Sequence, residues 1–190
     1  MTKARLATRA LLAFLALVSS PILVIVLMAA LPPKVEQGAR VRAWLMDADY
    51  LGTTGVRLQQ NSSDCAVAAL EMLVEGLGRD VRPLAAWRDS VQRRGEGMTF
   101  LEMQRAAATA GVGTHGVRAT LAGLRRVPLP AIVHFDHHFV VLDRIDDGGT
   151  FQLRDPASGR MRMGADAFRE AFTGEVLAVG PSRPARVATP

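Results

Sequence analysis

An uncharged, strongly apolar run of 22 residues at positions 10–31 is the feature that most constrains how this chain can fold. An α-helix of that length rises about 33 Å, enough to cross the roughly 30 Å hydrocarbon core of a bilayer. Lys3, Arg5 and Arg9 precede the run, and basic residues on that side of a span keep it in the cytoplasm. We therefore expect residues 1–33 to hold a cytoplasmic N-terminus and one transmembrane helix in the inner membrane, with the rest of the chain outside the cytoplasm.

A cleaved secretory signal peptide is the alternative interpretation of this run. The apolar region of such a peptide usually covers only about 7–15 residues and ends at a small-x-small site. The run here is longer, and Pro21 directly follows the "VSS" that would form one such site, although "MAA" before Leu31 offers another. The length of the run favours an anchor that is not cleaved.

The chain contains a single cysteine, Cys65, among 190 residues. One thiol cannot form an intrachain disulfide framework or a zinc site made of several cysteines, and we expect no metal or cofactor. The formal net charge is +5, but no Lys/Arg block with interleaved aromatics occurs, so a nucleic-acid partner is not expected. In an oxidising space outside the cytoplasm, a lone thiol is either buried or reactive.

The rest of the chain changes from helical to strand-like patterns along its length. Apolar residues first recur at helical spacing, and later β-rich runs alternate with turn residues, so helices precede an antiparallel meander in an α+β fold. We expect a tether with one short amphipathic segment at residues 34–55, a folded domain at 56–180 and a disordered tail at 181–190. Within the domain, the expected helices cover residues 64–75, 84–92, 99–110 and 164–172, with a helical turn or two near 121–128, and the expected strands cover 112–117, 130–135, 138–145, 150–155 and 174–179.

Cys65 would stand at the N-terminus of the first of these helices, where free backbone N–H groups and the helix dipole stabilise a thiolate. A nucleophilic thiol also needs a base, and the base needs an orienting group. His138 opens one expected strand and Asp155 closes the next, so antiparallel pairing can make them neighbours. Gln59, six residues before Cys65, could donate its side-chain amide to an oxyanion together with the Cys65 backbone N–H.

Each of these residues also has a purely structural interpretation. A lone cysteine in an Ala/Leu-rich helix is usually a core residue, and Gln59 could simply be solvated. His138 could cap a turn, and an Asp before a Pro, as in "DPASG", commonly opens one. His137 is a rival base, and because side chains alternate along a strand, only one of the two neighbouring histidines can face Cys65.

Taken together, these segments resemble the bacteriocin-processing, or double-glycine, cysteine peptidases. The family opens with a Gln, followed six residues later by a Cys and a Leu/Met-rich helix, as in "QQNSSDCAVAALEML" with Gln59 and Cys65. A Pro-Ala-Ile strand, a His before Phe and an acid in an Asp-Pro-Ala-x-Gly turn follow in that order, here "LPAIVHF", His138 before Phe139, and Asp155. The resemblance covers about residues 55–179.

The resemblance implies a papain-like fold and cleavage of leader peptides after a Gly-Gly pair. It assigns Cys65 as nucleophile, His138 as base, Asp155 as orienting acid and Gln59 as oxyanion donor. Its implied partners are a peptide with small residues at the cleavage site and possibly a peptide exporter. Ala66 departs from the family pattern, which has Gly after the cysteine.

Three other functions compete with proteolysis. A non-catalytic, membrane-tethered module of the same fold would bind leader-like peptides, and Ala66 is the feature that points to it. A papain-like enzyme could instead transfer an acyl group to an amine. A structural envelope protein would merely pack Cys65 in its core.

Overall fold

The structure, a computed structural model, describes residues 35–180. The expected transmembrane helix at residues 10–31 and the expected tail at 181–190 lie outside the described residues. None of the helices between Val35 and Gly180 is both long enough and apolar enough to cross a bilayer. The chain divides into a unit that ends at Gly38 and a larger unit, Ala39–Pro190, and the description below concerns the larger one.

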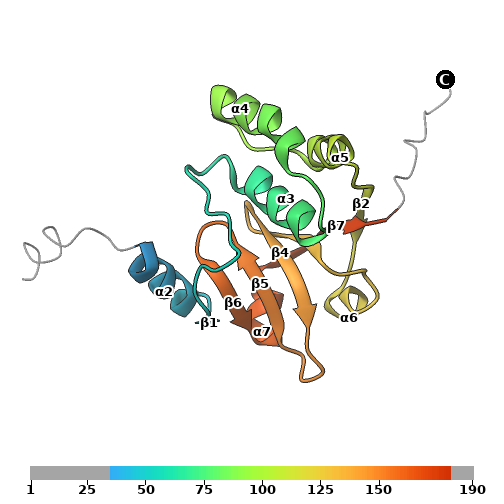
Figure 1. Cartoon of the computed structure of the whole chain (residues 1–190). Coiled ribbons are helices and arrows are strands. Elements are labelled where there is room, and N and C mark those ends of the chain that lie inside the picture. The colour runs from blue at the N-terminus through green and yellow to red at the C-terminus, as the bar shows by residue number, and fades with distance from the viewer. Residues whose placement is uncertain (1–34, 181–190) are drawn as a thin grey trace, which may run out of the picture. The chain divides into compact units, whose positions relative to one another are not determined.

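A seven-stranded sheet, in which every strand pair is antiparallel, organises the domain (Figure 1). The strands lie in the order β1-β6-β5-β4-β3-β7-β2, so the chain builds the centre as a meander and the last strand returns to the other side of β3. The strands are β1 (Ala48–Tyr50), β2 (Thr114–Arg118), β3 (Ala131–Phe135), β4 (His138–Ile145), β5 (Phe151–Asp155), β6 (Gly159–Met163) and β7 (Phe172–Val179).

Most of the helices precede the meander in sequence, as expected for this α+β fold. Thr99 and Glu102 form a capping box at the start of one helix: the Thr99 hydroxyl accepts the Glu102 N–H at 3.2 Å, and the Glu102 carboxylate accepts the Thr99 N–H at 2.8 Å. The helices are α2 (Val35–Leu45), α3 (Cys65–Gly76), a 3₁₀ turn (Arg82–Leu84), α4 (Ala85–Arg94), α5 (Phe100–Thr109), α6 (Leu121–Leu124) and α7 (Ala165–Ala171).

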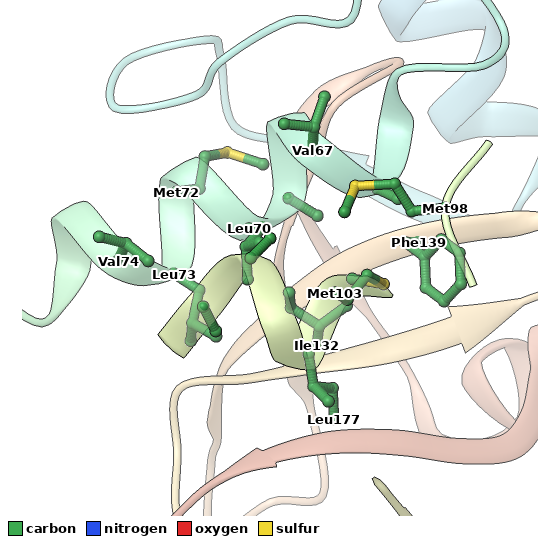
Figure 2. Close-up of a cluster of buried hydrophobic side chains, with 14 of the residues drawn as sticks. Val67, Leu70, Met72, Leu73, Val74, Met98, Met103, Ile132, Phe139 and Leu177 are labelled. Atoms are coloured by element: carbon green, nitrogen blue, oxygen red, sulfur yellow. The ribbon is translucent and has the colours of Figure 1, made fainter. Parts of the chain in front are cut away.

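Alternating side chains on the central strands supply two separate hydrophobic clusters. On β4, Phe139 and Val141 join a cluster with the buried face of α3, whereas Val140 and Leu142 join a cluster with Phe168 of α7. Figure 2 shows the first cluster, in which apolar residues of α3 lie against Met103, Ile132 and Leu177. The sheet is therefore apolar on both faces, and α3 is held over its centre.

Two strands occupy places where the sequence analysis expected none. β1 lies inside the expected tether, and its Ala48 and Tyr50 pair with Met163 and Met161 of β6. β6 follows the "DPASG" turn, and its methionines are buried while Arg160 and Arg162 face outward. The alternation is that of a half-buried strand, but the run has only five residues and none of the β-branched or aromatic residues that are enriched in strands.

Candidate active site

Cys65 is the first residue of α3, and 5% of its surface is exposed. Burial raises the pKa of the Cys65 thiol, but hydrogen bonds from His138 and from the backbone amides of Phe139 and Ala66 outweigh burial and bring the pKa below its ordinary value. The helix N-terminus thus contributes through an identifiable group, the Ala66 N–H. The environment favours a thiolate at a nearly buried position.

His138 and Asp155 meet at one edge of the sheet. His138 opens β4 and Asp155 closes β5, and because these strands are antiparallel their two ends are adjacent. His138 Nε2 lies 2.5 Å from Asp155 Oδ1, which also accepts the Ala157 N–H at 2.7 Å. With Nε2 engaged by the carboxylate, Nδ1 is the ring nitrogen left for the Cys65 sulfur.

The same contacts set the charge of the imidazole. Burial lowers the pKa of His138, but its bonds to Asp155 and Cys65 and the charges of both raise it to about 9. Burial raises the pKa of Asp155, but the bond to His138 and the Ala157 N–H hold it below its ordinary value. The shifts therefore all favour the charged forms, a thiolate, an imidazolium and a carboxylate in series.

His137 does not join this arrangement. It lies in the turn between β3 and β4 with a φ of 55°, and 95% of its side chain is exposed. Its Nε2 lies 3.4 Å from Asp136, which is also on the surface. Of the two neighbouring histidines, His138 is the one that the fold directs to Cys65, as the sequence analysis expected.

Gln59 is held beside the turn that carries Asp155. Its backbone N–H donates to the Pro156 carbonyl at 2.8 Å. Its side-chain Oε1 is buried and has no hydrogen-bond partner in the described part of the protein. The turn itself requires Gly159, whose φ is +107°, because a Cβ there would lie 2.6 Å from the Gly52 carbonyl oxygen. Gln59 is thus tied through the backbone to the same turn as the orienting acid.

A charged network behind Cys65 was missed by the sequence analysis. Asp64 is fully buried, and its carboxylate accepts the N–H groups of Asn61 and Gln60 at 3.0 and 3.2 Å. Arg88 of α4 contacts Asp64 at 3.2 Å and binds both carboxylate oxygens of Glu71 at 3.0 and 2.8 Å. One signal was available, since Glu71 is the single acid in the otherwise apolar stretch "CAVAALEMLV".

Ala66, the departure from the family pattern, fits this geometry. It is helical and fully buried in the cluster between α3 and the sheet. A glycine is not required by the backbone, because the residue adopts an ordinary helical conformation. Its N–H still reaches the Cys65 sulfur. Between Val35 and Gly180, no group of three or more His, Cys, Asp or Glu side chains could hold a metal ion.

Known proteins match the chain over this same domain. Residues 53–183, more than half of the chain, match the Peptidase C39 family. The uncharacterized protein MTBMA_c00490 of Methanothermobacter marburgensis is 32% identical over 136 residues, which cover 68% of this chain and 91% of that protein. The probable functional amyloid protease FapD of Pseudomonas aeruginosa is 31% identical over 132 residues, which cover 64% of this chain and 58% of FapD.

A solved structure extends the likeness to the fold. It is the crystal structure of a double glycine motif protease from an AMS/PCAT transporter in complex with the leader peptide. It superposes with a TM-score of 0.53 at 25% identity, over 67% of this chain and 91% of that chain. The family and fold inferred from the motifs are thereby confirmed, and the chain belongs to the peptidase C39 family, with its papain-like α+β fold.

Proposed function

We propose that this protein is a cysteine peptidase that cleaves leader peptides after a Gly-Gly-type pair. The observation that carries the proposal is the series formed by Cys65, His138 and Asp155, with His138 Nε2 2.5 Å from the carboxylate. Family membership supports a peptidase, and the leader-bound double glycine motif protease supports the class of substrate. Cys65 as nucleophile and His138 as base are sufficient for this reaction.

In this mechanism the Cys65 thiolate attacks the carbonyl carbon of the scissile bond. The His138 imidazolium then gives its proton to the departing amine as the carbon–nitrogen bond breaks, which leaves a thioester on Cys65. Water, deprotonated by the now neutral imidazole, attacks the thioester and releases the acid. The thiolate and the imidazolium are restored together. Asp155 keeps the ring oriented and stabilises its charge throughout.

The oxyanion formed during each attack needs donors that are already in place. The Cys65 backbone N–H at the start of α3 is one proposed donor, and the Gln59 side-chain amide is the other. The fit of Gln59 is supported by its backbone bond to Pro156, which fixes it beside the Asp155 turn. Removal of one such donor typically costs about 3–4 kcal/mol of transition-state stabilisation.

We further propose that the apolar run at residues 10–31 anchors the protein in the inner membrane with the peptidase domain outside the cytoplasm. The support is the length of the run and the basic residues before it. A peptide would then meet this enzyme as it leaves the cytoplasm, and a peptide exporter is the partner that would supply it.

The direct test is to incubate the purified full-length chain in detergent with peptides that contain a Gly-Gly pair after a leader-like segment. Products are identified by mass spectrometry. We expect a single cut after the second glycine, no cut by Cys65→Ala, and no cut of a matched peptide in which both glycines are leucines. Equal cleavage by wild type and Cys65→Ala would exclude the mechanism.

The low exposure of Cys65, 5%, favours one second candidate, a peptide-binding module of the same fold without turnover. Alkylation with iodoacetamide below pH 7 distinguishes the two, because only a thiolate reacts quickly there. The peptidase requires fast alkylation. Slow alkylation, together with peptide binding but no cleavage, would favour the binding module.

A further inference from the structure

Helix α2 presents an apolar face that the domain does not cover. Val41, Trp44 and Leu45 are 57%, 76% and 71% exposed. Their spacing of three and four residues puts them on one side of the helix. Of the five large hydrophobic residues exposed within residues 35–180, these three lie together on this helix.

The opposite side of the same helix is buried. Ala39 and Ala43, four residues apart, are 4% and 1% exposed. At about 100° per residue, their directions differ from that of Val41 by roughly 160–200°. The exposed apolar face is therefore distinct from the buried face of the helix, and at its C-terminal end Trp44 and Leu45 border open hollows beside β6 and α7.

Arginines border the apolar face on its two sides. The same helical spacing places Arg40 beside Trp44 and Arg42 beside Leu45, and both arginines are exposed. The Arg40 guanidinium lies 5.6 Å from the centroid of the Tyr50 ring. An apolar strip with a tryptophan, flanked by basic side chains, is the arrangement of a helix that lies in a membrane interface.

The chain itself brings this helix close to the apolar run. Leu31 ends the run and Val35 begins α2, so four residue steps separate them and can span at most about 14 Å. The exposed face begins six residues later, at Val41, within about 9 Å along the helix. A bilayer that holds the run is thus within reach of the face.

We propose that α2 lies flat in the membrane interface, with Val41, Trp44 and Leu45 in the headgroup–acyl boundary and Arg40 and Arg42 at lipid phosphates. The occupant of the apolar face is the lipid surface itself. The buried side of α2, with Ala39 and Ala43, would then face away from the lipid, and α2 would hold the domain at the bilayer surface instead of leaving it on a flexible tether. This inference rests on the proposed anchor at residues 10–31 but not on the peptidase activity.

Two tryptophans make the test direct, since the chain holds only Trp44 and Trp87. The full-length chain is reconstituted into vesicles of equimolar phosphatidylethanolamine and phosphatidylglycerol that contain phosphatidylcholine brominated near the glycerol end or near the methyl end of its acyl chains. In Trp87→Phe, we expect Trp44 to lose most of its fluorescence to the shallow bromines and less to the deep ones. In the matched control Trp44→Phe, Trp87 on α4 should be unaffected by either lipid.

Flotation of the same vesicles separates the two proposals. A chain that floats with the vesicles but whose Trp44 is not quenched overturns the interfacial placement while the anchor stands. Trp44 that is unquenched by bromine yet shielded from acrylamide would show that a second copy of this chain covers the face, and would also overturn the interfacial placement. A chain that does not float refutes the anchor, and the inference with it. Peptide cleavage, measured in detergent, is independent of all three results.

Discussion

At the scale of single residues, the neighbours of His138 keep its imidazole ring protonated. Burial alone would favour a neutral ring, and it is the Asp155 carboxylate and the Cys65 sulfur that raise the pKa of His138 to about 9. The same contact lowers the pKa of the thiol. The two groups therefore titrate as a pair, and the thiolate–imidazolium form exists above the lowered pKa of Cys65 and below the raised pKa of His138.

The pH profile of cleavage follows from these directions. As pH rises, kcat/KM should increase while Cys65 loses its proton, below the ordinary thiol pKa, and should fall as His138 loses its proton near pH 9. In Asp155→Asn the carboxylate no longer opposes burial, so the pKa of His138 drops and the alkaline limb moves to lower pH. We would measure kcat/KM across the range for both proteins, and an unmoved alkaline limb in Asp155→Asn would contradict the role of Asp155.

The two adjacent histidines provide a matched pair of variants. His138→Ala should lower kcat by about 10²–10⁴-fold, the usual contribution of a general acid–base. His137→Ala should leave kcat and KM unchanged, because that side chain is 95% exposed in a turn. Initial rates on a Gly-Gly peptide decide between them. The reverse pattern of losses would show that the wrong base was assigned.

How much of the site could be predicted depended on local sequence. Cys65, His138 and Asp155 each start or end an element, so antiparallel pairing made His138 and Asp155 possible neighbours, and the family resemblance added Cys65 to them before any coordinates. Arg88 carries no such signal, because its partners Asp64 and Glu71 lie 24 and 17 residues away and only helix packing makes them meet. Charge pairs across elements are set by tertiary structure, which local patterns do not encode.

At the scale of elements, Arg88 of α4 forms ion pairs with Asp64 at the start of α3 and with Glu71 further along the same helix. Asp64 has no exposed surface and the Glu71 side chain is 9% exposed, so both carboxylates need a cation, and Arg88 is the nearest one to each; Arg57 Nε lies 3.8 Å from Glu71 as a second. Asp64 in turn holds the backbone N–H groups of Gln60 and Asn61. The network therefore fixes the segment between Gln59 and Cys65, which carries both proposed oxyanion donors.

Arg88→Met should weaken the fold and the site together. It removes the nearest cation from two nearly buried carboxylates. We expect the free energy of unfolding to fall by roughly 2–3 kcal/mol, less than for a fully buried pair because Arg88 keeps 19% exposure and Glu71 retains Arg57 Nε at 3.8 Å. Urea denaturation in detergent measures this change. At temperatures where the variant is folded, kcat should also fall, and Arg88→Lys should recover part of it through a single charge.

Arg82→Met is the control for this network. Arg82 pairs with Asp80 on the surface, where the two side chains are 90% and 47% exposed, so its loss should change neither stability nor kcat noticeably. An Arg88→Met protein as stable and as active as Arg82→Met would show that the buried network holds neither the fold nor the loop.

At the scale of the whole molecule, the sheet separates two hydrophobic clusters, and the sequence predicted only part of its strand order. The meander from β3 to β5 was expected because its strands are consecutive. The position of β7 between β3 and β2 was not expected, because its pairings join residues that are 37 to 65 positions apart in the sequence. One cluster packs under α3 beside Cys65, and the other packs under α7.

The two faces of the sheet should therefore separate stability from catalysis. Met163 is 1% exposed, belongs to the cluster under α7 and lies at the end of β6 opposite the turn that carries Asp155. Met163→Ala should lower the free energy of unfolding by about 2–5 kcal/mol through the lost apolar contacts and the cavity left behind. Because the cavity opens away from Cys65 and His138, kcat/KM of the folded protein should stay at the wild-type value.

Arg162→Ala, one residue earlier on the same strand, removes an exposed side chain paired with Asp49 and should cost about 1 kcal/mol or less. Urea midpoints and kcat/KM measured on the same preparations compare the variants. If Met163→Ala lowered kcat/KM as strongly as Asp155→Asn at a temperature where it remains folded, the cluster under α7 would have to support the site directly. The inference that the face under α7 contributes to stability but not to catalysis would then be wrong.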